Sequence, residues 1–437
     1  MNQYIFTNNH RNVLFGAMGL GLICLILTWI GDDGHHTRFW TNFLHNSVFF
    51  TMIAATALFF LAVCITAYSG WHTTFKRVWE AYAMFLFVGL VLMVVLGLGV
   101  YMHWHHLYHW ADAASVENDA VLKGKASFLN KNWYFFGTII FLGAWSFFAM
   151  KLRNLSLDED KSGDSRFAHH KNMRVWAAVL LPIFGFSSAA MIWQWVMSVD
   201  AHWYSTLFAW YSTASAFIAM IALTILLIIF LKSNGYFEEV NGNHIHDLGK
   251  YLFAISIFWT YLWFSQFMLI WYANIGEETI YFRERYDHYP ILFFGNLIIN
   301  FLVPFFILMR NDTKRKFGSV SFVAIICLLG HWIDYFLMIK PGALINVSHA
   351  AGQGSEGHGA EVHTEAGGHA IEQVAAHGVE HASSFVAGFS FPGLLELGTF
   401  IGFLGLFLFV ALTILSKSAL VPKNDPYLEE SLHHHVI

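Results

Sequence analysis

Ten long apolar stretches constrain the fold of this chain more than any other feature of its sequence. A helix needs about 20 apolar residues to cross the hydrocarbon core of a bilayer, and each stretch is long enough to do so. They cover residues 13–30, 43–68, 78–102, 133–150, 175–198, 206–231, 251–273, 290–309, 319–339 and 392–416. The sequence therefore predicts an all-α integral membrane protein with ten transmembrane helices.

The composition fits this class and excludes others. Charged residues make up only 12% of the chain, against about 25% in a typical soluble domain. The ten stretches use most of the 437 residues and leave no room for a soluble catalytic domain, and a net charge of −5 argues against a nucleic-acid partner. Cys24, Cys64 and Cys327 lie far apart inside apolar stretches, so we expect buried thiols rather than disulfides or metal ligands.

The basic residues predict the orientation of the helices. With both termini on one side of the membrane, 17 of the 24 Lys and Arg residues fall on that side and 7 on the other. Cytoplasmic loops of membrane proteins carry the excess of basic residues. We therefore predict that both termini are cytoplasmic.

Ionisable residues then crowd toward the outer half of the membrane. At 1.5 Å per residue, His331 lies roughly 3 Å and Asp334 roughly 8 Å beyond the midplane, three residues apart and on one helix face. Charges at such depth are costly and usually functional. We interpret His331 and Asp334 as a proton-transfer pair, with Lys340 as a candidate cationic partner. The alternative is a structural pair that hydrogen-bonds to a neighbouring helix.

The outer segment 193–206 has the residues that a quinol site needs. Trp193, Trp203 and Tyr204 offer flat apolar walls for a ring, while Asp200 and His202 offer groups that accept hydroxyl protons. The amides of Gln194 and Gln266 fall at a similar depth, and we include them in the predicted quinone pocket. The same residues are also typical of an interfacial aromatic belt.

Four further carboxylates are candidates for a proton path. Glu277 and Glu278 close the seventh stretch on the outer side, and Glu396 opens the tenth roughly 12 Å beyond the midplane. Glu80 is the main acidic residue of the inner half. Glu277 and Glu278 have a second interpretation, as a solvated helix end paired with the nearby arginines at 283 and 285.

Two outer motifs carry a family resemblance. Residues 197–206 (MSVDAHWYST) and 270–279 (IWYANIGEET), together with Trp332-Ile333-Asp334 and the ten-span layout, resemble the membrane subunits of bacterial alternative complex III. These subunits belong to the NrfD/polysulfide-reductase-like superfamily. The resemblance covers the whole membrane portion, and the length and long outer insert are more similar to the ActF-type subunit than to its ActC-type paralogue. His331 stands where the family pattern has an arginine.

The resemblance implies a domain layout. Residues 43–198 and 199–339 would form two four-helix bundles, and the regions 1–42 and 392–437, each with one helix and a tail, would be peripheral. Residues 340–391, rich in His, Gly and Ala, would form a periplasmic loop. The location implied is the bacterial cytoplasmic membrane.

The resemblance also implies partners and cofactors. The parent complex oxidises menaquinol or ubiquinol and passes electrons through iron–sulfur and haem c subunits to cytochrome c or a terminal oxidase. The partners would be those subunits, an ActC-like membrane subunit and lipids.

We expect no redox centre, haem or metal in this chain. A b-type haem needs paired histidines on facing helices, and only His45 and His331 lie inside the predicted spans. A run of four histidines has metal-like spacing, but no cysteine or carboxylate joins it locally; its members are His103, His105, His106 and His109.

The sequence thus predicts a membrane subunit of a respiratory quinol-oxidising complex that contributes an outer quinone-like pocket or a proton pathway. Two alternatives stay open. The chain is a secondary transporter with a site at the midplane, or it is a structural anchor for electron-transfer subunits.

Overall fold

The computed structural model describes residues 3–32, 34–163, 166–353 and 388–435. Within these residues the chain is helical, with no strand and one isolated bridge between Gln3 and Ala419. Ten helices are long and apolar enough to cross a membrane, which confirms the predicted number and order. Their bounds are α1 Asn8–Ile30, α2 Thr37–Thr66, α3 Lys76–Ala83 continuing into α4 Leu86–Tyr101, α7 Lys131–Ser162, α8 Ala168–Trp195, α9 Thr206–Ser233, α10 Gly242–Ala273, α12 Pro290–Leu297 continuing through the π-helix η4 Ile298–Leu302 into α13 Val303–Leu308, α15 Phe317–Gln353, and α18 Leu394–Leu415.

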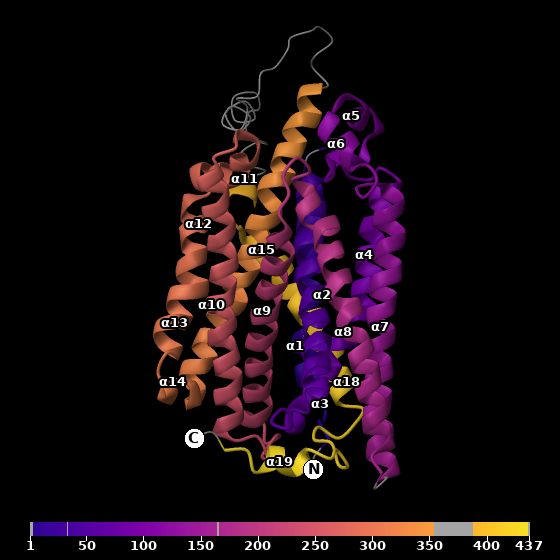
Figure 1. Cartoon of the computed structure of the whole chain (residues 1–437), viewed down its shortest axis with the longest axis vertical. Helices are drawn as coiled ribbons and strands as arrows, with labels where there is room; N and C mark the ends of the chain where they lie inside the picture. Colours follow the sequence, from indigo (N-terminus) through magenta and orange to yellow (C-terminus); the bar gives the residue numbers. More distant parts are fainter. Residues whose placement is uncertain (1–2, 33, 164–165, 354–387, 436–437) are drawn as a thin grey trace.

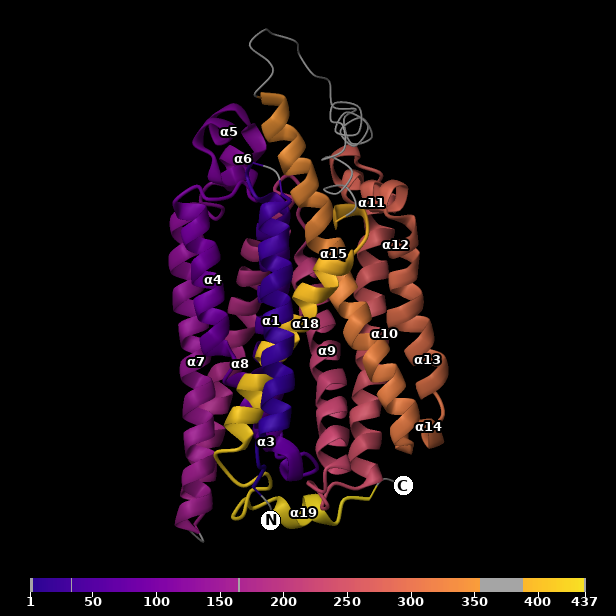
Figure 2. The same ribbon diagram turned by 180° about the vertical axis from the view of Figure 1, so that it is seen from behind.

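Shorter helices cover the two ends of the molecule (Figures 1 and 2). One end holds both termini and is called the terminal end below; the opposite end is called the distal end. The helices α5 Ala113–Asn118, α6 Ala120–Lys125 and α11 Gly276–His288 lie at the distal end. The helices α14 Asn311–Arg315 and α19 Leu428–Leu432 lie at the terminal end.

Polar residues cap the helices where they leave the apolar core. Asn130 accepts a hydrogen bond from the Trp133 amide at the start of α7, and Asn241 forms a capping box at the start of α10. Asp119 accepts from two amides at the start of α6. Such caps satisfy backbone donors that have no partner inside the helix.

The helices α2 and α9 form the centre of the molecule. Their apolar windows are 89% and 83% buried, against 22% for α1. α2 packs against α4, α8 and α9, and α9 packs against α10 and α15. The helices α4 and α7 therefore lie on one flank, and α10, α12 and α13 on the other (Figure 1).

The first and last spans pack against each other through glycine. A Cβ on Gly402 would lie 2.5 Å from the Cα of Gly21, and one on Gly398 would lie 2.2 Å from the Cys24 sulfur. Only glycine permits two helix backbones to approach this closely. α1 and α18 consequently lie side by side along their length (Figure 2).

The ninth span is longer than predicted. α15 continues to Gln353, so the loop predicted for 340–391 begins inside a helix, and Lys340 is a buried helical residue. The helix passes Pro341 because the segment beyond it is apolar and is held in place at Asn346. The Asn346 amide donates to the Leu107 and Val199 carbonyls at 2.8 and 2.9 Å. The remainder of that predicted loop is described only from residue 388.

Candidate functional site

Asp334 lies at the centre of a buried polar cluster between four helices. Tyr211 and Ser215 on α9, Trp259 on α10 and Asn296 on α12 all donate hydrogen bonds to its carboxylate. The bonds from Ser215, Trp259 and Asn296 measure 2.8, 2.9 and 2.7 Å. Each carboxylate oxygen accepts two donors, which uses the acceptor capacity of an ionised carboxylate. Neutral donors, rather than a cation, therefore hold Asp334.

Ser215 links Asp334 to His331. The Ser215 hydroxyl donates to Asp334 and lies 2.9 Å from His331 Nδ1. Because its one proton points to Asp334, the hydroxyl accepts from His331, so Nδ1 carries the imidazole proton. His331 Nε2 is buried and has no hydrogen-bond partner among the described residues. The sequence-predicted pair is thus connected through Ser215, and Nε2 of His331 remains as a hydrogen-bond acceptor without a donor among the described residues. The direct distance between His331 Nδ1 and Asp334 Oδ2 is 3.9 Å.

Lys340 is not the cationic partner of Asp334. Its ammonium donates to Asn42 Oδ1 at 2.6 Å and lies 4.4 Å from the centre of the Phe389 ring. Lys340 is six residues beyond Asp334 on α15, which places it more than one and a half turns away.

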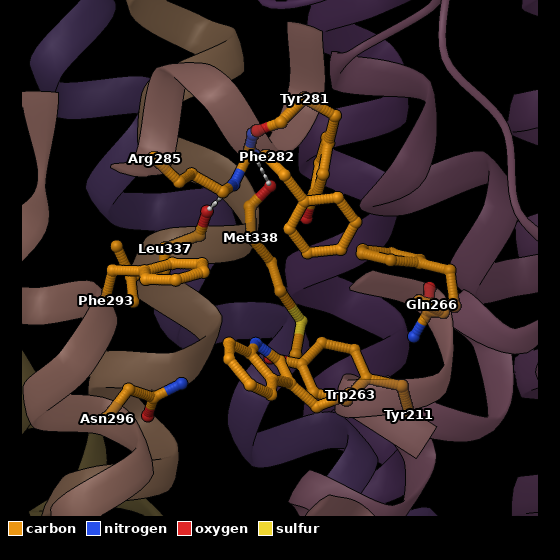
Figure 3. Close-up of a pocket in the computed structure, with 11 residues that line it drawn as sticks. Tyr211, Trp263, Gln266, Tyr281, Phe282, Arg285, Phe293, Asn296, Leu337 and Met338 are labelled. Carbon is orange, nitrogen blue, oxygen red and sulfur yellow. Dashed lines mark hydrogen bonds between the residues drawn. The ribbon is translucent and has the colours of Figure 1, made fainter. Parts of the chain in front are cut away.

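A small cavity, whose lining Figure 3 shows, lies between two partners of Asp334 and helix α11. Its volume is about 20 Å³, enough for about one water molecule. Tyr211 and Asn296, which bind Asp334, line it, and so do Gln266 and Arg285. A water molecule in this cavity would have several polar partners and would extend the hydrogen-bonded cluster toward the distal end.

A larger pocket at the distal end holds three of the predicted quinone-binding residues. It has a volume of about 330 Å³ and is called the distal aromatic pocket below. Trp193, Trp203 and Tyr204 line it, together with Lys125 and Ser205. Pockets that bind small molecules start at about 300 Å³ and are mainly apolar with a few polar groups, and this pocket meets both criteria.

Two donors in the walls of this pocket lack partners. The indole N–H groups of Trp193 and Trp203 are buried and make no hydrogen bond within the described part of the chain. The Trp203 ring is held in place by stacking on Tyr281 of α11, with 3.8 Å between ring centres. Because water does not reach either nitrogen, a ligand in the pocket would contact carbon atoms of these rings rather than the two donors.

The two amides predicted for the pocket lie outside its lining. Gln194 donates to the Phe128 carbonyl at 2.5 Å and so supports the wall from behind. Gln266 lines the small cavity, and its side-chain oxygen accepts from Ser205 at 3.0 Å. Because Ser205 lines the pocket, the Ser205–Gln266 bond connects the distal aromatic pocket with the cavity above Asp334.

Asp200 and His202 face away from this pocket. Asp200 forms an ion pair with Arg285 of α11 at 2.9 Å, and His202 pairs with Asp119 at the start of α6. Lys125 donates to the carbonyls of Ala201 and His202 and so fixes the loop between these two pairs. The acid and base predicted to accept quinol protons therefore hold the loop in place and do not line the pocket.

Arg285 is a central residue of the distal site that the sequence did not single out. It is buried, and besides Asp200 it donates to the carbonyls of Leu337 and Tyr281 at 2.9 and 2.8 Å. The interpretation that pairs it with Glu277 or Glu278 is wrong, because its guanidinium turns inward. Those two glutamates begin α11 at the surface, with Glu277 exposed.

Glu284, beside Arg285, is a titratable group that the sequence analysis missed. Burial, and then the negative charge of Asp200, raise the pKa of Glu284 from 4.5 to about 7. A carboxyl group with a raised pKa stabilises the fold while it is protonated. Its contribution is complete below pH 4.5 and is lost as the pH rises through about 7.

We expect the stability of α11 to fall between about pH 4.5 and 7, by at most about 3 kcal/mol at about 1.4 kcal/mol per pH unit. Hydrogen exchange of residues 276–288, corrected for the intrinsic pH dependence of exchange, measures this change. Glu284→Gln should remove it, whereas the exposed control Glu277→Gln should keep it. A pH-dependent loss that persists in Glu284→Gln would assign the effect to another group.

The other two carboxylates of the predicted proton path are ion-paired. Glu396, in the first turn of α18, accepts two hydrogen bonds from Arg38, at 2.8 and 3.0 Å. Glu80 contacts Arg77 at 2.7 Å and Arg153 at 3.5 Å at the terminal end. The structure therefore does not bring Glu80, Glu277, Glu278 and Glu396 together in one path with Asp334.

More histidines lie in helices than the sequence indicated. His170 is in α8, and His244 and His246 are in α10, each within the first turns. His45 Nε2 donates to the Trp332 carbonyl at 2.9 Å in the centre of the molecule. The four-histidine run does not converge: among the described residues, the one group of three suitable metal ligands lies elsewhere and consists of Glu159, His170 and Asp425.

No protein-family model matches the chain, and no curated protein matches it significantly. The function therefore has to be argued from the geometry of the site and from the sequence motifs.

Proposed function

We propose that the chain is the ActF-like membrane subunit of a respiratory quinol-oxidising complex, and that its distal aromatic pocket binds the ring of menaquinone or ubiquinone. The observation that carries the proposal is the pocket of about 330 Å³ whose walls include Trp193, Trp203 and Tyr204. The aromatic rings of Trp193, Trp203 and Tyr204 would hold the flat quinone ring by apolar contact.

The same proposal gives the Asp334 cluster its role. A proton released in the pocket has a polar route through Ser205 and Gln266 to the small cavity. From there the Tyr211 hydroxyl, which donates to Asp334, leads to this carboxylate as the proton acceptor, while Ser215 connects the carboxylate to His331. Positioned hydroxyl, carboxylate and imidazole groups within hydrogen-bonding distance are what proton transfer requires.

The proposal extends to the architecture and the cellular location of the chain. We propose two four-helix bundles, in spans two to five and six to nine, with cytoplasmic termini in a bacterial inner membrane. The packing of α4 and α7 on one flank and of α10 and α13 on the other supports the two bundles. The position of both termini at one end of the molecule supports their common location in the cytoplasm. Iron–sulfur and haem c partners would carry the electrons, and this chain would carry none.

Loss of one pocket wall tests the proposal. In the purified complex, Trp193→Ala should weaken binding of a short-chain quinol by about 3- to 10-fold, because an aromatic contact contributes about 0.5–1.5 kcal/mol. Binding is measured by titration and turnover by quinol oxidation. Tyr272→Ala on α10, which removes an aromatic ring that is 84% exposed and outside the pocket, is the matched control. Equal quinol affinity in both variants would favour the anchor function.

One observation favours a secondary transporter as the second candidate. The eighth span is interrupted by the π-helix Ile298–Leu302, next to the buried amides of Asn296 and Asn300. Such interruptions often occur at functional sites, and transporters bind substrates at broken helices. Purification of the chain without haem-bearing or iron–sulfur partners, together with substrate uptake by proteoliposomes, would support this candidate.

A further inference from the structure

The terminal end contains a buried cluster of charged side chains that the proposed function does not use. It is called the terminal charge cluster and joins α3, α7 and α8 to the C-terminal tail. Lys76 pairs with Asp425, and Arg77 pairs with Asp160 at 2.5 Å. The members are Lys76, Arg77, Glu80, Arg153, Glu159, Asp160, His170 and Asp425.

Two members of the cluster are buried without hydrogen bonds. Glu159 is 4% exposed and His170 is 5% exposed. Within the described residues, neither oxygen of Glu159 and neither ring nitrogen of His170 has a hydrogen-bond partner. The groups nearest to Glu159 are His170 Nδ1 at 3.4 Å and Lys76 Nζ at 3.8 Å. Buried polar groups are rarely left in this state, because each lost hydrogen bond is costly.

The cluster also lacks one positive charge. Lys76, Arg77 and Arg153 supply three positive charges, while four carboxylates supply four negative charges. Counted without His170, the buried cluster therefore carries a net charge of −1. An unbalanced buried charge is unfavourable in a medium of low dielectric constant.

Three of the side chains are arranged like metal ligands. One oxygen of Glu159, one ring nitrogen of His170 and one oxygen of Asp425 all lie within 4.8 Å of one another. His170 and Asp425 also line a cavity of about 10 Å³. The three come from α7, α8 and the tail, so no spacing in the sequence identifies them.

We propose that Glu159, His170 and Asp425 bind a divalent transition-metal ion, with Zn²⁺ as the best fit. One imidazole and two carboxylates suit zinc, which accepts nitrogen and oxygen ligands and leaves a fourth position for water. Mg²⁺ and Ca²⁺ prefer oxygen ligands alone. A zinc ion with a bound hydroxide adds one net positive charge, which balances the cluster.

Metal binding at this site would fasten the tail to the helices. Asp425 is the tail's contribution, and the segment after it includes α19, whose Ser431 donates to the Trp71 carbonyl at 2.9 Å. The ion would link this segment to α7 and α8 by coordination to its ligands. Lys76 would keep its bond to Asp425, since each carboxylate oxygen has two acceptor sites.

Zinc titration of the full-length chain tests the proposal. The chain is purified in detergent, stripped with a chelator and titrated with ZnCl₂ by calorimetry. The background carries His433→Ala and His435→Ala, which remove exposed imidazoles that bind zinc adventitiously. We expect one zinc ion per chain, and zinc should slow hydrogen exchange of the segment 423–432.

Ligand variants decide the outcome. His170→Ala and Glu159→Gln should each weaken zinc binding by about 100-fold or more, since even outer-shell changes cost 10- to 100-fold. The neighbouring His169→Ala is the matched control and should bind zinc as the parent chain does. Glu159→Gln removes a carboxylate that makes no hydrogen bond and one excess negative charge of the cluster, so its melting temperature without zinc should not fall, which separates lost binding from lost folding. No stoichiometric zinc, or unchanged affinity in His170→Ala, would overturn the proposal.

Discussion

Asp334→Ala should destabilise the folded chain by roughly 3–5 kcal/mol and abolish quinol oxidation. The change removes the acceptor for Tyr211, Ser215, Trp259 and Asn296 at once. Each buried donor left without a partner costs about 1–3 kcal/mol, reduced where a water fills the space. Reversible unfolding in mixed micelles measures the first effect, and turnover of the purified complex measures the second.

Asp334→Asn separates proton transfer from stability. The amide keeps the shape of the side chain but turns an NH₂ group toward two donors, so we expect a smaller loss of about 1–3 kcal/mol. Because an amide does not take up a proton at neutral pH, turnover should still fall to background while the complex remains assembled. The control Asp312→Asn removes a carboxylate that is 70% exposed and should change neither quantity. Normal turnover in Asp334→Asn would exclude this residue from the proton path.

Arg285→Leu should cost about 3–5 kcal/mol, because it leaves the Asp200 carboxylate and the Leu337 carbonyl without their donor in a buried site. The loop 196–205 and α11 meet at this ion pair, so the stacking of Trp203 on Tyr281 should loosen as well. We expect quinol affinity to fall together with stability. Thermal unfolding and hydrogen exchange of residues 276–288 report the change.

The neighbouring arginine provides the control for this prediction. Arg283 is 81% exposed and lies 3.4 Å from Asp287. Exposed pairs contribute at most about 1 kcal/mol, so Arg283→Leu should have little effect. A double variant, Asp200→Asn with Arg285→Leu, should be less destabilised than the sum of the two single variants. If the changes in the free energy of unfolding of the two single variants simply add up in the double variant, the ion pair does not couple the loop to α11.

The sequence predicted the ten spans because their length and apolarity are properties of contiguous residues. It also identified Asp334 and the three aromatic residues of the pocket, since an acid deep in a span and an aromatic-rich outer loop stand out locally. It missed α11, whose residues 276–288 are mostly polar and read as a loop after the seventh span. Because α11 was not predicted, the ion pair between Asp200 and Arg285 of α11 was not predicted either, and Asp200 was wrongly expected to line the pocket.

The partners of Asp334 could not be predicted for a different reason. Tyr211, Trp259 and Asn296 lie on three other helices, and their convergence depends on how each helix is rotated about its axis. A single sequence fixes which residues share one helix face but not which faces meet. The ligands Glu159, His170 and Asp425 illustrate the same limit, since six helices that cross the membrane separate the last from the first.

The contact between Gly21 and Gly402 has a consequence for biogenesis. α1 buries little of its surface except against α18, and a ribosome that adds about 5–20 residues per second needs tens of seconds to proceed from Ile30 to Leu394. During that interval, lipid or an insertase covers the face of α1 that will later contact α18. The contact between α1 and α18 therefore forms only after residues 394–415 have been synthesised and α18 inserts beside α1.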